Sequence, residues 1–107
     1  MNFSGDFENF KREGNWITSF PDGKVHIVET FKDGLKNGLY LKINRRGSLL
    51  EQSSYLNDSL NGKLMRFNPG GKLQLEENYL KGKLDGVRRV YYERGGVQEQ
   101  SNFVNGQ

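Results

Sequence analysis

The sequence predicts an all-β fold: an elongated, single-layer antiparallel β-meander built from 24-residue β-hairpin repeats. Three observations support this prediction. The chain has 14 glycines among its 107 residues, about twice the usual share. Only 34% of its residues are hydrophobic, which suits a thin sheet with many turns better than a thick two-layer core. Finally, glycines recur at a fixed spacing, and no apolar period of 3.6 residues runs long enough for a helix.

The period appears when the chain is shifted against itself by 24 residues, because two sets of glycines then align. The first set opens the units and comprises Gly14, Gly38, Gly62 and Gly86. The second set occupies the tenth unit position and comprises Gly23, Gly47, Gly71 and Gly95. We interpret both sets as structural turn glycines, since glycine adopts the positive φ that tight turns require.

The predicted domain organisation is a single repeat array. It comprises a partial unit at 1–13, three full units at 14–37, 38–61 and 62–85, and a nearly complete unit at 86–107. Repeat arrays usually close with polar capping units. Incomplete units at both ends therefore suggest a fragment of a longer array, or edges that something else covers.

Each unit is expected to contain two strands and two turns. The first strands are expected at about 16–20, 40–43, 64–67 and 88–92. The second strands are expected at about 25–31, 49–55, 73–79 and 97–103. A second turn follows each of these, and Asp58 once replaces its glycine at small cost. Because short turns make successive strands antiparallel neighbours, about nine strands form a sheet about 40 Å long.

The third unit shows the repeat motif most clearly, as GKLMRFNPGGKLQLEENYLKGKLDG over residues 62–86. This motif resembles MORN repeats (membrane occupation and recognition nexus), specifically the bacterial variant found in YwqK-type antitoxin proteins. The resemblance spans essentially the whole chain and departs at Phe10, at Asp58 and at Arg88-Arg89. It implies an elongated β-meander that serves in protein interaction, dimerisation or membrane association. For YwqK-type members it also implies an antitoxin or immunity role against a secreted toxin.

The sequence shows no pattern typical of an enzyme, so we predict a non-catalytic protein without cofactor or metal. The chain has no cysteine and a single histidine, His26, which we interpret as structural. Glutamates that recur along the second strands are expected to pair with Lys or Arg across strands rather than to form catalytic or calcium sites. These are Glu29, Glu51, Glu76, Glu77 and Glu99. The glycine–lysine pairs at 71–72 and 82–83 precede no helix, so they are not phosphate loops.

One local enrichment of basic and aromatic side chains is a candidate partner-binding surface. It comprises Lys81, Lys83, Arg88, Arg89, Tyr92 and Arg94. Such a mixture suits a protein hot spot, an anionic lipid headgroup or single-stranded nucleic acid. The alternative is that these arginines only flank a core Tyr91 on the wet face of the sheet. A net charge of +3 is too low for a dedicated nucleic-acid binder, so we expect no nucleic-acid partner.

The leading functional hypothesis is a module for protein–protein interaction or scaffolding, with a toxin or effector as the expected partner. Peripheral association with anionic membrane lipids is one alternative, and self-assembly into a homo-oligomer through exposed edge strands is another. The sequence has neither a long apolar run nor a signal-peptide pattern at its start, so a cytoplasmic location is expected. Removal of an upstream segment would instead allow a secreted or membrane-attached protein.

Overall fold

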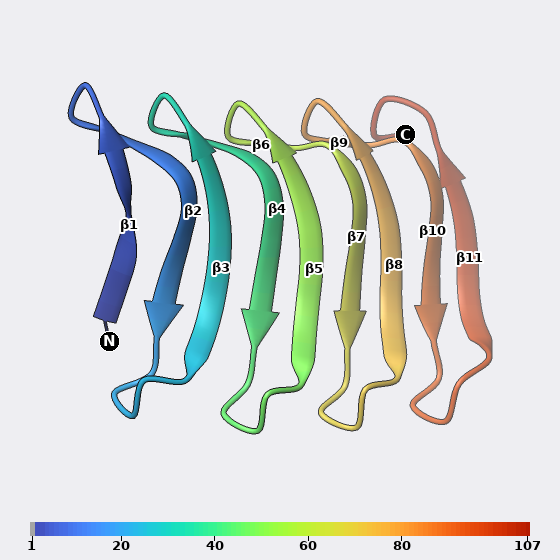
Figure 1. Ribbon diagram of the computed structural model, residues 1–107. Coiled ribbons are helices and arrows are strands. Elements are labelled where there is room, and N and C mark those ends of the chain that lie inside the picture. Colours follow the sequence, from blue (N-terminus) through green and yellow to red (C-terminus); the bar gives the residue numbers. More distant parts are fainter. Residues whose placement is uncertain (1) are drawn as a thin grey trace.

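The computed structural model describes residues 2–107, which form one open antiparallel sheet without a helix in that range (Figure 1). The long strands lie side by side in chain order. They are β1 (Asn2–Glu8), β2 (Lys11–Ser19), β3 (Val25–Lys32), β4 (Leu35–Ile43), β5 (Leu49–Leu56), β7 (Gly62–Phe67), β8 (Leu73–Leu80), β10 (Gly86–Tyr91) and β11 (Val97–Phe103). Two short strands, β6 (Ser59–Leu60) and β9 (Lys83–Leu84), pair with β5 and β8.

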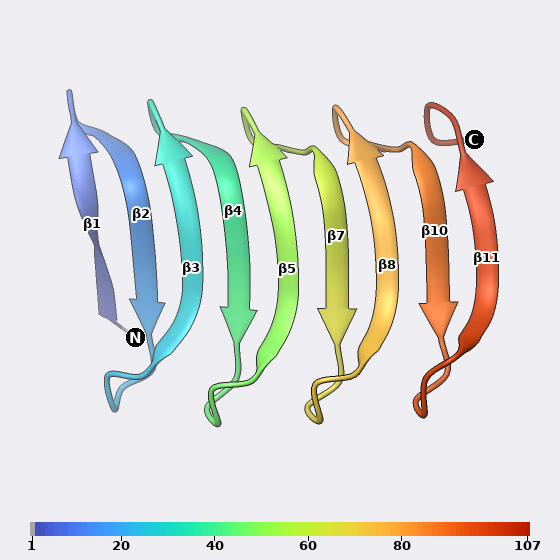
Figure 2. The ribbon, with the colours of Figure 1, turned by 45° about the vertical axis from the view of Figure 1, so that its right-hand side comes forward.

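The sheet is a single layer. All strands of the described residues pair within one sheet, which measures 44 × 33 × 13 Å. Figures 1 and 2 show its connections alternating between an upper edge, which holds the turns after β1, β3, β5 and β8, and a lower edge, which holds the loops after β2, β4, β7 and β10. The predicted all-β, single-layer meander of hairpins is confirmed.

The turns of the upper edge are hydrogen-bonded to strands of the preceding repeat. Two residues of positive φ form each turn, as at Asp33 and Gly34 with φ of 52° and 81°. The second turn residue donates its backbone N–H to a carbonyl in the preceding repeat, for example from Gly34 to Arg12 at 3.0 Å and from Gly82 to Leu60 at 2.8 Å. Each repeat therefore orders the turn of the next one.

Asp58 takes the place of a turn glycine and keeps the same geometry, with φ of 70°. Its backbone N–H donates to the carbonyl of Lys36 at 2.9 Å, as the glycines do at the equivalent position. Its carboxylate oxygen Oδ1 also accepts from the backbone N–H of Lys36 at 2.7 Å. This additional hydrogen bond offsets the strain of a left-handed aspartate, so the turn tolerates the replacement.

The glycines that open the units do not lie in the turns, which corrects the expectation for this set. Gly14 and Gly38 lie inside β2 and β4, and Gly62 and Gly86 are the first residues of β7 and β10. Their φ angles are positive because the strand register shifts around them: three residues of β4 lie opposite one residue of β3 between the pairs Glu29–Tyr40 and Phe31–Lys36. Strands β2 and β4 therefore begin before these glycines, about five residues earlier than expected.

The glycines of the tenth unit position lie in the lower loops, as expected. These are Gly23, Gly47, Gly71 and Gly95, with φ between 88° and 102°. Each donates its backbone N–H to the carbonyl three residues earlier, as Gly23 does to Phe20 at 2.8 Å. Four similar loops therefore project in a row along the lower edge (Figures 1 and 2).

The core is thin and lies mostly on one face of the sheet, which we call the tryptophan face. The strand register places Trp16, Tyr40 and Leu64 in one row on this face. The Trp16 ring meets those of Phe7 and Phe31 edge to face, with centroids 4.8 Å and 6.3 Å apart. Its Nε1 donates to the Asp6 carbonyl at 3.0 Å, so the buried indole keeps its hydrogen bond.

Candidate functional site

The structure does not bring the six predicted partner-binding residues together. Lys81 and Lys83 lie at the upper edge, in the turn after β8 and in β9. Tyr92 and Arg94 lie in the lower loop between β10 and β11, at the opposite end of the strands (Figure 1). The two remaining residues, Arg88 and Arg89, lie in the middle of β10. Three separate locations replace the single surface that the sequence suggested.

Arg88 points to the tryptophan face and is held by carboxylates there. Its Nε lies 2.8 Å from Oε2 of Glu77, and its Nη1 lies 3.9 Å from Oε2 of Glu99. The Tyr79 hydroxyl donates to the other oxygen of Glu77 at 2.9 Å. Burial, assisted by this bond to a carboxylate, raises the pKa of Tyr79. The guanidinium is thus paired with carboxylates on this face of the sheet.

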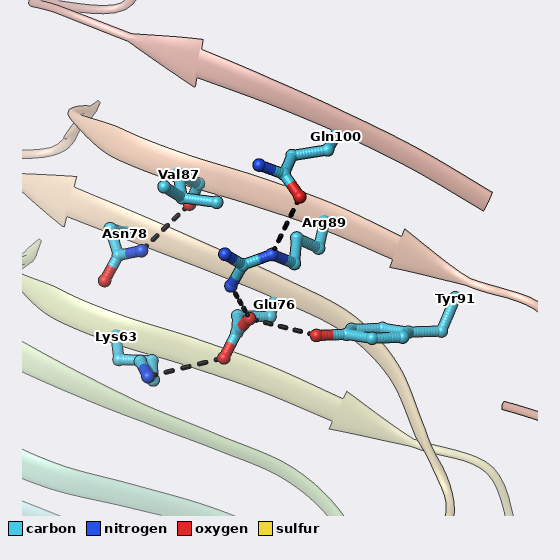
Figure 3. Close-up of polar contacts among 7 residues, drawn as sticks. All are labelled: Lys63, Glu76, Asn78, Val87, Arg89, Tyr91 and Gln100. Atoms are coloured by element: carbon cyan, nitrogen blue, oxygen red, sulfur yellow. Dashed lines mark hydrogen bonds and ion pairs between the residues drawn. The ribbon is translucent and has the colours of Figure 1, made fainter. Parts of the chain in front are cut away.

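Arg89 points to the opposite face and belongs to a second polar network, centred on Glu76 (Figure 3). Oxygen Oε1 of this buried glutamate accepts from Arg89 Nη1 at 2.9 Å and from the Tyr91 hydroxyl at 3.1 Å. Oxygen Oε2 lies 3.3 Å from Nζ of Lys63, and Arg89 Nε donates to Oε1 of Gln100 at 3.1 Å. Four neighbouring strands are connected through these side chains.

The hydrogen bond from Arg89 is the main cause that lowers the pKa of Glu76, with Tyr91 and Lys63 acting in the same direction against burial. The same bond raises the pKa of Arg89. Glu29 and Glu51 are likewise paired, with Lys36 at 3.3 Å and Arg66 at 2.7 Å. The expected pairing of the recurring glutamates with basic residues on neighbouring strands is therefore confirmed for these carboxylates.

His26 is engaged by the fold. Its Nδ1 lies 2.8 Å from the Ile43 carbonyl oxygen, and its ring lies against that of Phe20, with centroids 4.3 Å apart. Within residues 2–107, no group of three or more His, Cys, Asp or Glu side chains has an arrangement that could hold a metal ion. The same range contains no helix of the length and hydrophobicity needed to cross a membrane.

Three of the four most exposed large hydrophobic side chains among the described residues lie at the N-terminal edge of the sheet. We define the N-terminal edge surface as Phe3, Phe7, Asn9 and Phe10; the last three line an open hollow. The exposed fractions of the three phenylalanines are 68%, 64% and 101%. Strand β1 pairs only with β2 among the described residues, so the backbone groups along its outer side are free for hydrogen bonds.

Phe10 is the least expected residue of this surface. It occupies the turn position that Gly34, Gly82 and Gly106 occupy in other units, and its φ is 65°. A bulky aromatic residue in the left-handed region is strained, and a fully exposed phenylalanine gains nothing from burial. The sequence already shows the departure from glycine at this position. The sequence did not show that the Phe10 side chain is fully exposed.

The repeat units match a known protein family. The family described as MORN repeat variant matches residues 12–33, 60–81 and 84–105, which together make up more than half of the chain. The three matches begin at the same point of the 24-residue unit, two residues after the turn glycine position. No curated protein matches the chain.

Proposed function

The chain belongs to the MORN repeat variant family, and from this premise we propose that it is a non-catalytic protein-interaction module whose partner binds the N-terminal edge surface. One observation carries this proposal. Phe3, Phe7 and Phe10 are exposed beside an edge strand whose outer backbone groups have no partner among the described residues.

An edge strand of this kind suits binding by strand addition. A partner strand pairs with the free N–H and C=O groups of β1, and its side chains contact the phenylalanines. Aromatic anchors supply much of the binding energy of an interface when the partner removes them from water. Phe7 is also fixed in place, because its ring packs on Trp16 at 4.8 Å. The surface is thus partly ordered before binding, which lowers the entropic cost of association.

The toxin or effector expected from the YwqK-type resemblance is the partner that we propose for this edge. A second copy of the chain is the other protein that can supply an edge strand. Peripheral membrane binding through the six basic and aromatic residues is less favoured, because they lie at two opposite edges and on two opposite faces. A flat anionic surface does not contact all of them together.

The proposal is tested with the double variant Phe3→Ser/Phe10→Gly, used as bait in pull-down experiments from host cells. We expect proteins captured by the native chain to be recovered about tenfold less by the variant, since two aromatic contacts are lost. The thermal midpoint should not fall, because glycine relieves the left-handed strain of Phe10. Light scattering distinguishes a toxin or effector from a second copy of the chain as the partner. If the native chain has the mass of two copies and the variant has the mass of one, the partner is a second copy.

The matched control is Val97→Ser/Val104→Ser near the other edge of the sheet, where these valines are 49% and 70% exposed. It removes two exposed apolar side chains without touching β1. Capture should therefore match that of the native chain. Capture that survives the phenylalanine changes, or that falls equally in the control, contradicts binding at the N-terminal edge surface.

A further inference from the structure

The lower edge of the sheet carries a second surface, distinct from the N-terminal edge surface. Four loops project there, at 20–24, 44–48, 68–72 and 92–96, and Figures 1 and 2 show them in a row. One groove lies between the first two loops and another between the last two; we call them the first and the third groove, after the loop that begins each. The loops have the same backbone design but different side chains, so the grooves can be compared position by position.

The first groove lies between loops 20–24 and 44–48, with a volume of about 520 Å³. Val25 and Ile43 contribute apolar surface to it, and Lys24, Arg45 and Arg46 contribute three positive charges. No carboxylate lines the groove. The nearby Asp22 is outside the lining, and its Oδ1 accepts from the backbone N–H of Lys24 at 3.1 Å.

The three cations of the first groove are free of acidic partners. None of the ion pairs between described residues includes Lys24, Arg45 or Arg46. The Arg45 guanidinium lies over the Phe20 ring, 4.9 Å from its centroid, which holds it beside the groove without neutralising it. This situation contrasts with Arg88 and Arg89, whose charges are compensated by glutamates inside the sheet.

The third groove lies 48 residues further along the chain and has a similar volume, about 530 Å³. There Lys72 and Arg94 correspond to Lys24 and Arg46, but Glu93 takes the place of Arg45. The Lys72 ammonium donates to the Arg94 carbonyl at 3.5 Å, across the groove. At the intervening repeat, these unit positions hold Ser48, Pro69 and Gly70, which carry no charge. The lining of the first groove therefore carries three positive charges and no negative one, whereas that of the third carries two positive charges and one negative.

We propose that the first groove binds an extended acidic segment of a partner protein, with carboxylates paired to Lys24, Arg45 and Arg46 and an apolar side chain against Val25 and Ile43. Charge complementarity supports an anionic ligand, and Arg45 and Arg46 can each bind a carboxylate in a bidentate manner. The apolar lining favours a polypeptide over a free phosphate. A groove between two loops also fits a narrow chain better than a flat bilayer.

The probe for this site is a short fluorescein-labelled peptide in which glutamate alternates with leucine, and binding is followed by fluorescence anisotropy. We expect Arg45→Glu/Arg46→Glu to weaken binding about tenfold or more, because attraction is replaced by repulsion. The variant Lys24→Glu/Arg46→Glu should act similarly while leaving Arg45 over Phe20. Binding by the native chain should weaken as salt increases, since the Debye length falls from about 10 Å at 0.1 M to about 3 Å at 1 M.

The matched control is Lys72→Glu/Arg94→Glu in the third groove, which changes the net charge of the chain by the same amount. Binding should fall by less than about twofold in this variant if the site is the first groove. A peptide with glutamine in place of glutamate should not bind. An equal loss of peptide binding in the first-groove and third-groove variants would indicate only a general charge effect and would overturn the proposal.

Two further outcomes overturn the proposal. One is the absence of peptide binding by the native chain while circular dichroism shows an intact sheet. The other is binding to phosphatidylserine-containing vesicles, but not to the peptide, that Arg45→Glu/Arg46→Glu abolishes; the groove would then be a membrane site. The experiment does not depend on β1, so binding at the N-terminal edge surface and binding in the first groove succeed or fail separately.

Discussion

The two halves of the sheet use the same repeat positions in different chemical ways. In the N-terminal half, cations lie over aromatic rings: Arg12 is 4.7 Å from the Trp16 centroid, and Lys36 is 5.1 Å from that of Tyr55. Leu60 and Leu84 occupy the equivalent unit position in the C-terminal half. In that half the cationic side chain is Arg88, which occupies the unit position of Trp16 and pairs with Glu77.

This difference shows what the repeat constrains. The positive φ of its glycines and the hydrogen bonds between the turns and the preceding repeats set the backbone of every unit. The side chains must then cover one face of a sheet with only four buried hydrophobic residues among those described. Stacked aromatic and cationic groups do most of this in the N-terminal half, where Lys36 also pairs with Glu29, and the hydrogen-bonded pair of Arg88 and Glu77 does so in the C-terminal half. The backbone hydrogen bonds do not depend on which side chains cover the face. Both arrangements of side chains can therefore occur in one sheet.

The largest effect is expected from Trp16→Ala, which removes the centre of the N-terminal half. The indole contacts Phe7 and Phe31 and covers Gly5, so its loss leaves a cavity on a face with little other core. We expect the free energy of unfolding to fall by about 3 kcal/mol in urea denaturation. Hydrogen exchange should accelerate in β1 to β4 more than in β8 to β11. Uniform acceleration across the sheet would show that the halves are not separable.

A smaller effect is expected from Glu76→Gln, which weakens the C-terminal network. Loss of the charged bonds to Arg89 and Lys63 should lower the free energy of unfolding by about 2 kcal/mol at pH 7. The folded pKa of Glu76 lies below its ordinary value of 4.5, so this stabilisation is present above pH 4.5 and is lost as pH falls through the folded pKa. The native chain and the variant should therefore converge in stability in acid.

The matched control for the acid titration is Glu99→Gln. The side chain of Glu99 is 63% exposed, and its contact with Arg88 is 3.9 Å long. Its replacement should change stability by only a few tenths of a kcal/mol at any pH. A stability difference between the native chain and Glu76→Gln that stays constant from neutral to acid pH would contradict the ionic role assigned to Glu76.

Apart from that control, the smallest effect, and the only stabilising one, is expected from Ser53→Ala, where the two halves meet. Ser53 shares its unit position with Glu29 and Glu77, whose carboxylates are paired. Its own Oγ is buried and has no hydrogen-bond partner among the described residues. Removing this hydroxyl should raise the free energy of unfolding by about 1 kcal/mol. Lower stability in chemical denaturation would mean that the hydroxyl is satisfied in solution, for instance by water.

Several features of the fold follow from local chemistry and were accessible in the sequence. Glycines at the tenth unit position mark the lower loops, and Asp33-Gly34 with its counterparts marks the upper turns, because each needs positive φ. The glycines that open the units need positive φ as well, but at a shift of register within the strand. Conformational preference alone does not distinguish a turn from a bulge, so the beginnings of β2 and β4 were placed too late.

The candidate site was predicted less well for a different reason. Arg88 and Arg89 are neighbours in the chain, but consecutive strand residues point to opposite faces, and each arginine meets its own glutamate. Lys24 and Arg45 are 21 residues apart, yet they line one groove because two loops project side by side. Proximity along the chain therefore wrongly grouped Arg88 with Arg89, and it gave no indication that Lys24 and Arg45 lie together.

By itself, the sequence determined the period, the strand-and-turn alternation and the class of the fold, since these depend on backbone conformations that glycine and its neighbours allow. The tertiary structure alone decided which charges are neutralised inside the sheet and which remain free at its lower edge. The reason is that pairing depends on the register between strands and on the spacing of loops, and both arise only when successive repeats are hydrogen-bonded side by side.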